Sequence, residues 1–396
     1  MVLRALGLLF AVSSVVLFLY NFTLALVSLA CRRAVPQKAA QDLRFAIVVP
    51  AHNEERTIAA TLHSCQAIDY PADNYDVFVI ADNCTDDTAG VVSSHGIHCL
   101  VRQDPTRRGK GYALRWAFDQ LLPKGYDAFV VLDADCRIDA YSLNVFADEI
   151  ASRQAVLQAN NVVSNPDDSA ISYAVAVGNA MENHLYYRPK SELGLMVLLR
   201  GTGMVFRREV LERYPWGAFS IVEDMDYSIS LYKNGLKVKF LSDVAVRSPA
   251  PGDSEQLAAQ RSRWAGGNVQ LGKAGALKLL TEGIGKGKAI YVDMALTIVS
   301  QSKPLQLISV AALYLVSTLG ILLSRDRFFD GLFGLSNVLV IGYAAYILWG
   351  ILDLGLSRRR LELLLQTPPV LARLAVTALR SVVRGSDAAW ERTPRE

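Results

Sequence analysis

Acidic residues at the ends of two apolar segments are the first candidates for chemistry in this sequence. Asp82 closes the segment DVFVIAD, and Asp133 and Asp135 close the segment DAFVVLDAD. Because side chains i and i+2 of a strand point to the same side, Asp133 and Asp135 can address one point beyond the strand end. Two carboxylates at one point suit a hard divalent cation, Mg²⁺ or Mn²⁺, which would neutralise a diphosphate. A pair of turn or helix-capping aspartates is the alternative interpretation.

Asp82 lies in the segment VIADNCTDDT, where Asn83 and Thr85 can shape a turn. Asp86 and Asp87 open the following helix, whose dipole favours anions, and we assign the capping role to them. Asp82 is then available to accept a hydrogen bond from a ligand, such as the N3–H of uracil.

A second acidic pair, Glu223 and Asp224, opens a predicted helix in FSIVEDMDYSISL. Direct displacement by a hydroxyl needs one base, and a well-placed carboxylate can supply it. Asp224 is the candidate base, with Glu223 as its helper or alternative. Compensation of the helix dipole is the competing explanation of this pair.

Two further segments carry groups that suit anions. Lys110 lies in the basic, glycine-containing loop TRRGKGYAL, which could approach phosphates but lacks the Walker spacing. Gln260, Arg263 and Trp264 recur at i, i+3 and i+4, so on a helix they share one face. Arg263 could clamp a pyrophosphate, Gln260 could hydrogen-bond it or an acceptor, and Trp264 could stack against a sugar. Interfacial anchoring of the helix is the alternative.

The elements that must position these residues alternate between strand and helix. Apolar, β-branched segments such as FAIVVP (45–50) precede predicted helices, the first of which, 54–66, could be capped by Asn53. This alternation predicts an α/β fold with a parallel sheet covered on both faces. The ligand crevice of such a sheet lies at the carboxyl ends of its strands, where the acidic residues fall.

Three uncharged stretches, 5–31, 304–324 and 331–352, are long enough to cross a bilayer. The first is too long for the apolar core of a cleaved signal. Basic residues after the first and third stretches, among them Arg32, Arg33 and Arg358 to Arg360, indicate that these flanks are cytoplasmic. The segment 256–280 is expected to lie along the bilayer surface as an amphipathic helix. We therefore expect an integral inner-membrane protein with a cytoplasmic catalytic domain.

Composition excludes some classes of partner. The net charge is only +3, and the surplus lies mainly in the tail after the third stretch, which suits anionic lipid headgroups rather than nucleic acid. The five cysteines show neither paired nor metal-type spacing, so we expect no disulfide in a reducing cytoplasm. An oligomer is compatible with this composition.

These motifs together resemble the membrane-bound, family-two inverting glycosyltransferases, the group that includes cellulose, chitin and hyaluronan synthases and ceramide glucosyltransferases. VVPAHNEE resembles their nucleotide-binding opening, DNCTDD their uracil-contacting segment, DAD their metal motif, VED their catalytic-base motif and QRSRW their QxxRW motif. The likeness covers about Phe45 to Trp264.

The resemblance implies a GT-A (nucleotide-diphospho-sugar transferase) fold, a UDP-sugar donor, bound Mg²⁺ or Mn²⁺ and inversion without a covalent intermediate. By position, it assigns the metal to Asp133 and Asp135, the base to Asp224 and acceptor binding to Trp264 and Thr202. The donor-binding residues that it implies are Pro50, Asn53, Glu54, Asp82, Asp133, Asp135, Gln260 and Arg263, to which we add Lys110 of the basic loop.

The expected organisation is a transmembrane helix (1–33), a cytoplasmic GT-A domain (34–253), a QxxRW and interfacial segment (254–303), two transmembrane helices (304–356) and a basic tail (357–396). The expected activity is sugar transfer from UDP to a membrane lipid or glycan acceptor in cell-surface polysaccharide or glycolipid synthesis. A processive synthase that exports its product is an alternative, although only three spans and no gating-loop signature are visible. An inactive nucleotide-sugar-binding regulator is the alternative from another class.

Overall fold

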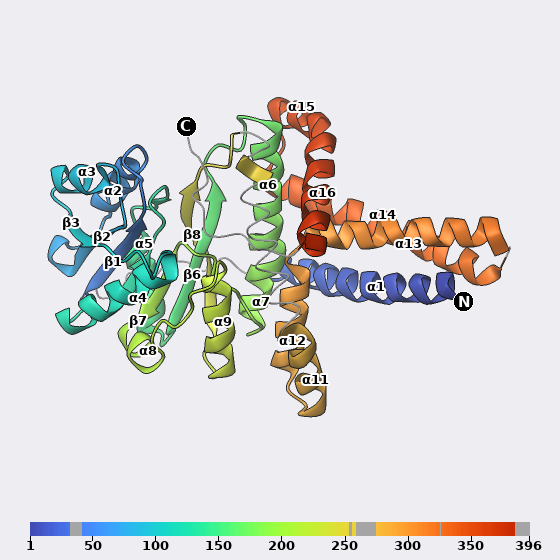
Figure 1. Ribbon diagram of the computed structural model, residues 1–396, viewed down its shortest axis with the longest axis horizontal. Helices are drawn as coiled ribbons and strands as arrows, with labels where there is room; N and C mark the ends of the chain where they lie inside the picture. The colour runs from blue at the N-terminus through green and yellow to red at the C-terminus, as the bar shows by residue number, and fades with distance from the viewer. Residues whose placement is uncertain (32–41, 253–255, 259–274, 325, 385–396) are drawn as a thin grey trace. The chain divides into compact units, whose positions relative to one another are not determined.

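The computed structural model describes residues 1–31, 42–252, 256–258, 275–324 and 326–384 of the chain. They form two compact units. A sheet unit comprises Arg32–Ser164 and Lys190–Ala250, and a helical unit comprises Met1–Cys31, Asn165–Pro189 and Pro251–Glu396. Figure 1 labels the elements of both units.

The sheet unit is built on an eight-stranded sheet of order β3-β2-β1-β4-β7-β6-β8-β5. Its strands are β1 (Phe45–Ala51), β2 (Tyr75–Asp82), β3 (His98–Arg102), β4 (Ala128–Val131), β5 (Arg137–Ile138), β6 (Val156–Val163), β7 (Met204–Arg207) and β8 (Val238–Ser248). All four residues of β4 and the first five of β1 are buried, as expected for strands covered on both faces. The predicted α/β class is confirmed.

The prediction of a parallel sheet is wrong for part of it. β1, β2, β3 and β4 pair in parallel, as do β6 and β8, but β7 runs antiparallel to both β4 and β6, and β5 runs antiparallel to β8. A short, fully buried apolar segment such as MVF in β7 looks the same in either direction, so its composition carries no information on strand polarity.

Helices follow most strands of the sheet unit, in line with the predicted alternation. They are α2 (Ile58–Gln66), α3 (Thr88–Ser94), α4 (Lys110–Leu121), α5 (Ser142–Ala151), α8 (Arg208–Arg213) and α9 (Glu223–Lys233), with single 3₁₀ turns at Ala72–Asn74 and Leu122–Lys124. Asn53 does not cap α2, because that helix begins four residues later than predicted, after Thr57. Asn53 instead adopts a left-handed conformation with φ 56° in the turn after β1.

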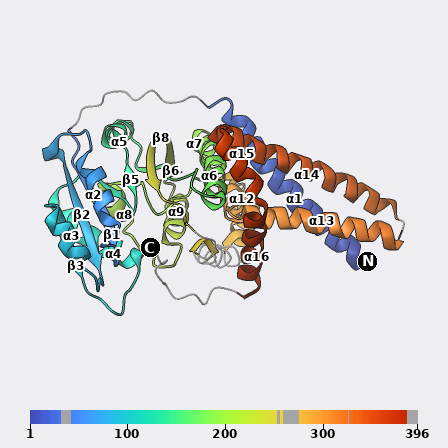
Figure 2. The ribbon, with the colours of Figure 1, turned by 90° about the horizontal axis from the view of Figure 1, so that it is seen from above.

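The helical unit contains three helices that are long and apolar enough to cross a membrane: α1 (Val2–Ser28), α13 (Lys303–Ser324) and α14 (Arg327–Leu354). They lie side by side in both views (Figures 1 and 2). The unit also contains α6 (Ala170–Ala180), a π-helical continuation (Met181–Tyr187), α11 (Leu277–Gly285), α12 (Ala289–Ser300), α15 (Arg358–Gln366) and α16 (Pro368–Arg384). Helix α7 (Arg188–Glu192) crosses the boundary between the units.

Candidate active site

Three charged side chains from different parts of the sheet unit converge on one glycine. A Cβ atom built on Gly201 would lie 3.3 Å from Lys110 Nζ, 3.5 Å from Asp224 Oδ2 and 4.0 Å from Asp133 Oδ2. Lys110 begins α4, Asp133 follows β4 and Asp224 lies in the first turn of α9. Gly201 has φ +77°, a conformation that residues with a Cβ rarely adopt. The backbone conformation at residue 201 therefore favours glycine at the point where the three charged groups meet.

Lys110 links the two predicted carboxylate sites. Its Nζ forms an ion pair with Asp133 and donates a 2.7 Å hydrogen bond to the Gly201 carbonyl. Burial alone would lower the pKa of the Lys110 ammonium, but the carboxylates of Asp133 and Glu223 outweigh this and leave the pKa raised. Lys110 therefore stays cationic and can attract a phosphate as well as the carboxylates.

The acidic pair at the start of α9 lies in an environment that disfavours negative charge. Burial raises the pKa values of both carboxyls, and the charge on Asp224 raises that of Glu223 further, while Lys110 opposes both shifts. Glu223 is only 8% exposed, whereas Asp224 retains more access to solvent. A carboxylate with a raised pKa is a better proton acceptor than an exposed aspartate, which suits a general base.

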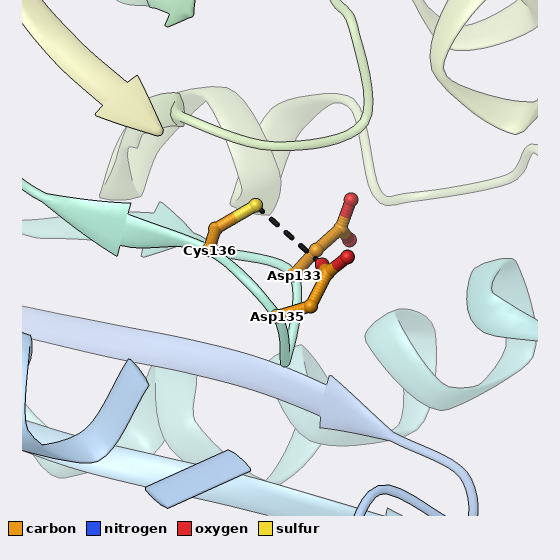
Figure 3. Close-up of side chains that lie close together, drawn as sticks. All are labelled: Asp133, Asp135 and Cys136. Carbon is orange, nitrogen blue, oxygen red and sulfur yellow. Dashed lines mark hydrogen bonds between the residues drawn. The ribbon is translucent and has the colours of Figure 1, made fainter. Parts of the chain in front are cut away.

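The metal-type group that the DAD motif predicts forms directly after β4. Ligand atoms of Asp133, Asp135 and Cys136 lie within 4.8 Å of one another, and Figure 3 shows the Cys136 thiol directed toward the two carboxylates. The thiol donates to Asp135 Oδ1 over 3.6 Å. Burial, and then the charge of Asp135, raise the pKa of the Cys136 thiol well above its usual value. The oxygen donors therefore fit a hard cation, with Cys136 as a neutral neighbour.

Asp82 ends β2 in a buried ion pair that the sequence did not reveal. Arg102, the last residue of β3, donates from Nη1 to Asp82 Oδ1 over 2.5 Å, and Asn83 Nδ2 donates to the same oxygen over 3.0 Å. Burial raises the pKa of the Asp82 carboxyl, and the Arg102 guanidinium opposes this shift. The parallel pairing of β2 with β3, which sets Asp82 opposite Arg102, brings these two residues together.

The turn after β1 is attached to the turn after β2. Asn53 Oδ1 accepts from the Thr85 N–H over 2.7 Å, and the Glu54 N–H donates to Thr88 Oγ1 over 2.8 Å. His52 Nδ1 lies 2.7 Å from the Asp82 carbonyl. Pro50 occupies the last part of β1 and is paired with Ile80 of β2. The expected donor segment 50–54 thus lies beside the end of β2. Asp86 Oδ1 accepts from the Thr88 N–H over 3.1 Å at the start of α3, whose N-cap residue Asp87 makes no side-chain capping bond.

Thr202 contacts the metal motif directly, because its Oγ1 accepts from the Asp133 N–H over 3.1 Å. Gln260, Arg263 and Trp264 lie outside the described residues.

Two residues beside the site, Gln158 and Gly201, were not among the residues predicted from the sequence. The glycine lies in the segment GTG, whose repeated glycines were a visible signal.

A solved structure of similar fold identifies the architecture of the sheet unit. A mannosyltransferase from Pyrobaculum calidifontis, solved in complex with GDP-Man and Mn²⁺, superposes with a TM-score of 0.61 at 19% identity, over 96% of this chain and 99% of its own. Its likeness identifies the fold of the sheet unit as GT-A, as predicted.

Curated relatives match over part of their length. A probable glycosyltransferase, YdaM, from Bacillus subtilis is 24% identical over 77% of this chain and 70% of its own length. A beta-monoglucosyldiacylglycerol synthase from Synechocystis is 27% identical over 62% of this chain, which spans only 54% of that relative. The profile described as "Glycosyltransferase like family 2" matches residues 42–267, more than half of the chain and all of the charged groups that meet at Gly201. The chain is therefore a member of glycosyltransferase family 2.

Proposed function

We propose that this protein transfers a sugar, with inversion, from a UDP-sugar to a lipid or glycan acceptor at the inner membrane, with the sheet unit in the cytoplasm. Family membership supports sugar transfer, and the three apolar helices support a membrane location. The name of the Synechocystis relative, a beta-monoglucosyldiacylglycerol synthase, favours a glycerolipid acceptor over a soluble one.

The convergence of Lys110, Asp133 and Asp224 at Gly201 is the observation that carries the proposal. Asp224 accepts the proton of the acceptor hydroxyl as its oxygen forms a bond to the anomeric carbon. The bond from that carbon to the diphosphate oxygen breaks, and the electron pair leaves with UDP. Lys110 lies where its positive charge can attract the phosphates of the donor. A base and a cation at one point are what single displacement requires.

Asp133 and Asp135 are the residues that would hold a divalent metal. When bound, Mg²⁺ or Mn²⁺ would supply Lewis-acid stabilisation of the diphosphate leaving group. Because the Cys136 thiol stays protonated, Asp133 and Asp135 are the charged ligands within this group of described residues.

Asp82 would recognise the base of the donor. One of its carboxylate oxygens already accepts from Arg102 and Asn83. The other can accept the N3–H of uracil, as the sequence motif DNCTDD suggests. Since the Pyrobaculum structure holds GDP-Man, guanosine donors belong in the same assay.

The decisive experiment compares two aspartates on one helix. Membranes containing the wild type, Asp224→Asn or Asp226→Asn are incubated with UDP- and GDP-sugars and Mg²⁺ or Mn²⁺, and nucleotide release and glycolipid products are measured. Asp226 shares the first turn of α9 but accepts from Ser220 Oγ, and residues two apart on a helix do not lie on the same face. We expect Asp224→Asn to lose about 10²-fold to 10⁴-fold in turnover, as removal of a general base does, and Asp226→Asn to lose little.

Equal losses in both variants would mean that the acidic pair only compensates the helix dipole, and would overturn the role of Asp224. The product then decides the acceptor. A lipid that gains one sugar supports the proposal, whereas a ladder of lengths would favour the processive alternative. Nucleotide binding without transfer to any membrane acceptor would favour the inactive regulator.

A further inference from the structure

The segment 195–203 leads into β7. Most of its residues are buried, but it forms neither a helix nor a strand. Met196, Val197, Leu198 and Leu199 are at most 1% exposed, and Thr202 is 6% exposed. Buried backbone N–H and C=O groups must find hydrogen-bond partners, and an irregular segment cannot find all of them in a regular ladder. We call this segment the buried loop.

One side chain from β6 satisfies two of these backbone groups at once. Gln158 Oε1 accepts from the Arg200 N–H over 2.8 Å, and its Nε2 donates to the Thr202 carbonyl over 2.8 Å. Nε2 also lies 2.9 Å from the carbonyl of Ala159. Gln158 is fully buried, so no water competes for its amide. The amide therefore holds both sides of Gly201 in a fixed position.

A second fully buried residue ties the same loop to the candidate base. Ser228 Oγ accepts from the Leu199 N–H over 2.8 Å and donates to the Asp224 carbonyl over 2.7 Å. Further along α9, Tyr232 Oη accepts from the Val197 N–H over 2.9 Å. The first turn of α9 and the buried loop are thus connected by side-chain hydrogen bonds.

The loop in turn holds the other charged groups of the site. The carbonyl of Gly201 accepts from Lys110 Nζ, and Thr202 Oγ1 accepts from the Asp133 N–H. Gly201 and Thr202 both lie in the short stretch of backbone between the Arg200 N–H and the Thr202 carbonyl, the two groups that Gln158 holds. A shift of the loop would therefore move Lys110, Asp133 and Asp224 relative to one another.

We infer that Gln158 is a positioning residue for sugar transfer: it sets the buried loop on which Lys110, Asp133 and the base meet. The catalytic part of this inference rests on the proposed function, but its geometric part does not. Gln158 touches neither the charged side chains nor, by its burial, a substrate, so its effect on turnover must pass through the loop.

Hydrogen exchange tests the geometric part without any assay of activity. Gln158→Met keeps the length of the side chain and removes the hydrogen bonds of the amide, while Gln120→Met makes the same change on the exposed side of α4. We expect the purified, full-length Gln158→Met protein to exchange faster in peptides covering 195–203, with the peptides of β1 and β2 unchanged. Gln120→Met should match the wild type. Unchanged exchange over 195–203 in Gln158→Met would overturn the inference.

Kinetics test the catalytic part. A misplacement of about 1 Å can cost about 10²-fold, so Gln158→Met should lose about tenfold to 10²-fold in kcat while the KM for the donor changes far less. Ser228→Ala should behave similarly, and the exposed Ser230→Ala on the same helix should not. If kcat is unchanged in Gln158→Met although exchange is faster, Gln158 holds the loop but the position of the loop does not affect catalysis. That result would overturn the inference.

Gln158→Glu supplies a signature that general destabilisation would not produce. When protonated, the carboxyl group of this variant can accept from the Arg200 N–H and donate to the Thr202 carbonyl, but the ionised carboxylate cannot donate. Buried carboxyls titrate as high as about pH 8–9, so the variant's kcat relative to wild type should be highest near about pH 6 and fall as pH rises. A ratio that does not vary with pH would contradict the role of the donated bond.

If the protein transfers no sugar at all, the proposed function fails while the exchange result still stands. If the wild type transfers sugar but the Gln158 variants match the control variants in hydrogen exchange and kcat, the proposed function stands and this inference fails.

Discussion

The ion pair between Arg102 and Asp82 has almost no access to solvent. Their side chains are 5% and 9% exposed, respectively, and Arg102 also donates to Asp104 over 3.1 Å and to the Arg107 carbonyl over 2.8 Å. A buried charge without its partner is strongly destabilising, although the intact pair itself contributes little net stability. Arg102 is therefore a structural requirement of the end of β2 at Asp82, independently of any ligand that Asp82 binds.

We predict that Arg102→Met destabilises the protein by about 3–5 kcal/mol, because it leaves the Asp82 carboxylate buried and unpaired. Arg107→Met is the matched control, since Arg107 pairs with the same Asp104 from a side chain that is 70% exposed, and it should change stability by less than about 0.5 kcal/mol. Thermal unfolding of the detergent-purified proteins measures both. The double variant Asp82→Asn/Arg102→Met should be more stable than Arg102→Met alone; if it is not, unpaired charge is not the cause.

At the scale of elements, the close approach of the buried loop to the sheet depends on Gly203. This residue has φ +65°, and a Cβ added to it would lie 2.9 Å from Ala159 Cβ and 3.0 Å from Val246 Cγ2. Its N–H donates to the Val131 carbonyl and its carbonyl accepts from the Ala159 N–H, both over 2.8 Å. Gly203 therefore joins β4 and β6 at the point where the buried loop becomes β7.

Gly203→Ala should consequently be more destabilising than Gly235→Ala. Gly235 also has a positive φ, +81°, but nothing lies within 4 Å of its added Cβ, so its substitution carries only the backbone cost of about 1–2 kcal/mol. Gly203→Ala adds steric overlap with β6 and β8, for which about 1–3 kcal/mol more is typical. Unfolding midpoints of the two variants compare them directly. Equal shifts would show that the sheet yields to the added methyl group.

Sequence patterns predicted the strands β1, β2 and β4, the alternation of strands with helices and the carboxylates at the strand ends, because these depend on local periodicity and on where apolar segments stop. The short strands β3 and β5 were not predicted. The patterns also did not predict that β7 runs antiparallel, since buried apolar segments carry no sign of direction. Nor did they predict Arg102 or Gln158. The bonds from Arg102 to Asp82 and from Gln158 to Thr202 join residues at least 20 positions apart, which the folding of the sheet brings together.

At the scale of the whole molecule, polar contacts join the three apolar helices. Asn21 of α1 donates to Gln306 Oε1 of α13 over 3.1 Å, and Tyr343 of α14 donates to the same oxygen over 3.0 Å. All three residues are at most 5% exposed. Polar side chains within apolar spans are usually directed toward other helices, where their hydrogen bonds are satisfied. The three helices therefore belong together as one bundle.

The two ends of this bundle differ in charge. At one end Arg4 of α1 pairs with Asp326, which caps α14 by accepting from the Phe328 N–H. At the other, α14 ends at Leu354 and is followed by Arg358, Arg359 and Arg360, of which Arg360 pairs with Asp167. An excess of arginine beside a span favours the cytoplasmic side. This orientation would leave the short connection between α13 and α14 outside.

Cysteine labelling tests this topology, because all five native cysteines lie in segments assigned to the cytoplasm or to its interface. In intact cells, a membrane-impermeant maleimide should label Asp330→Cys but neither the wild type nor Glu362→Cys, the matched acidic replacement on α15. After permeabilisation, Glu362→Cys should be labelled as well. Both positions are exposed in the structure, so the side of the membrane on which each lies, and not its burial, decides whether the maleimide reacts. Labelling of the wild type in intact cells would place a native cysteine outside, and the sheet unit would then be separated from a cytoplasmic supply of nucleotide sugar.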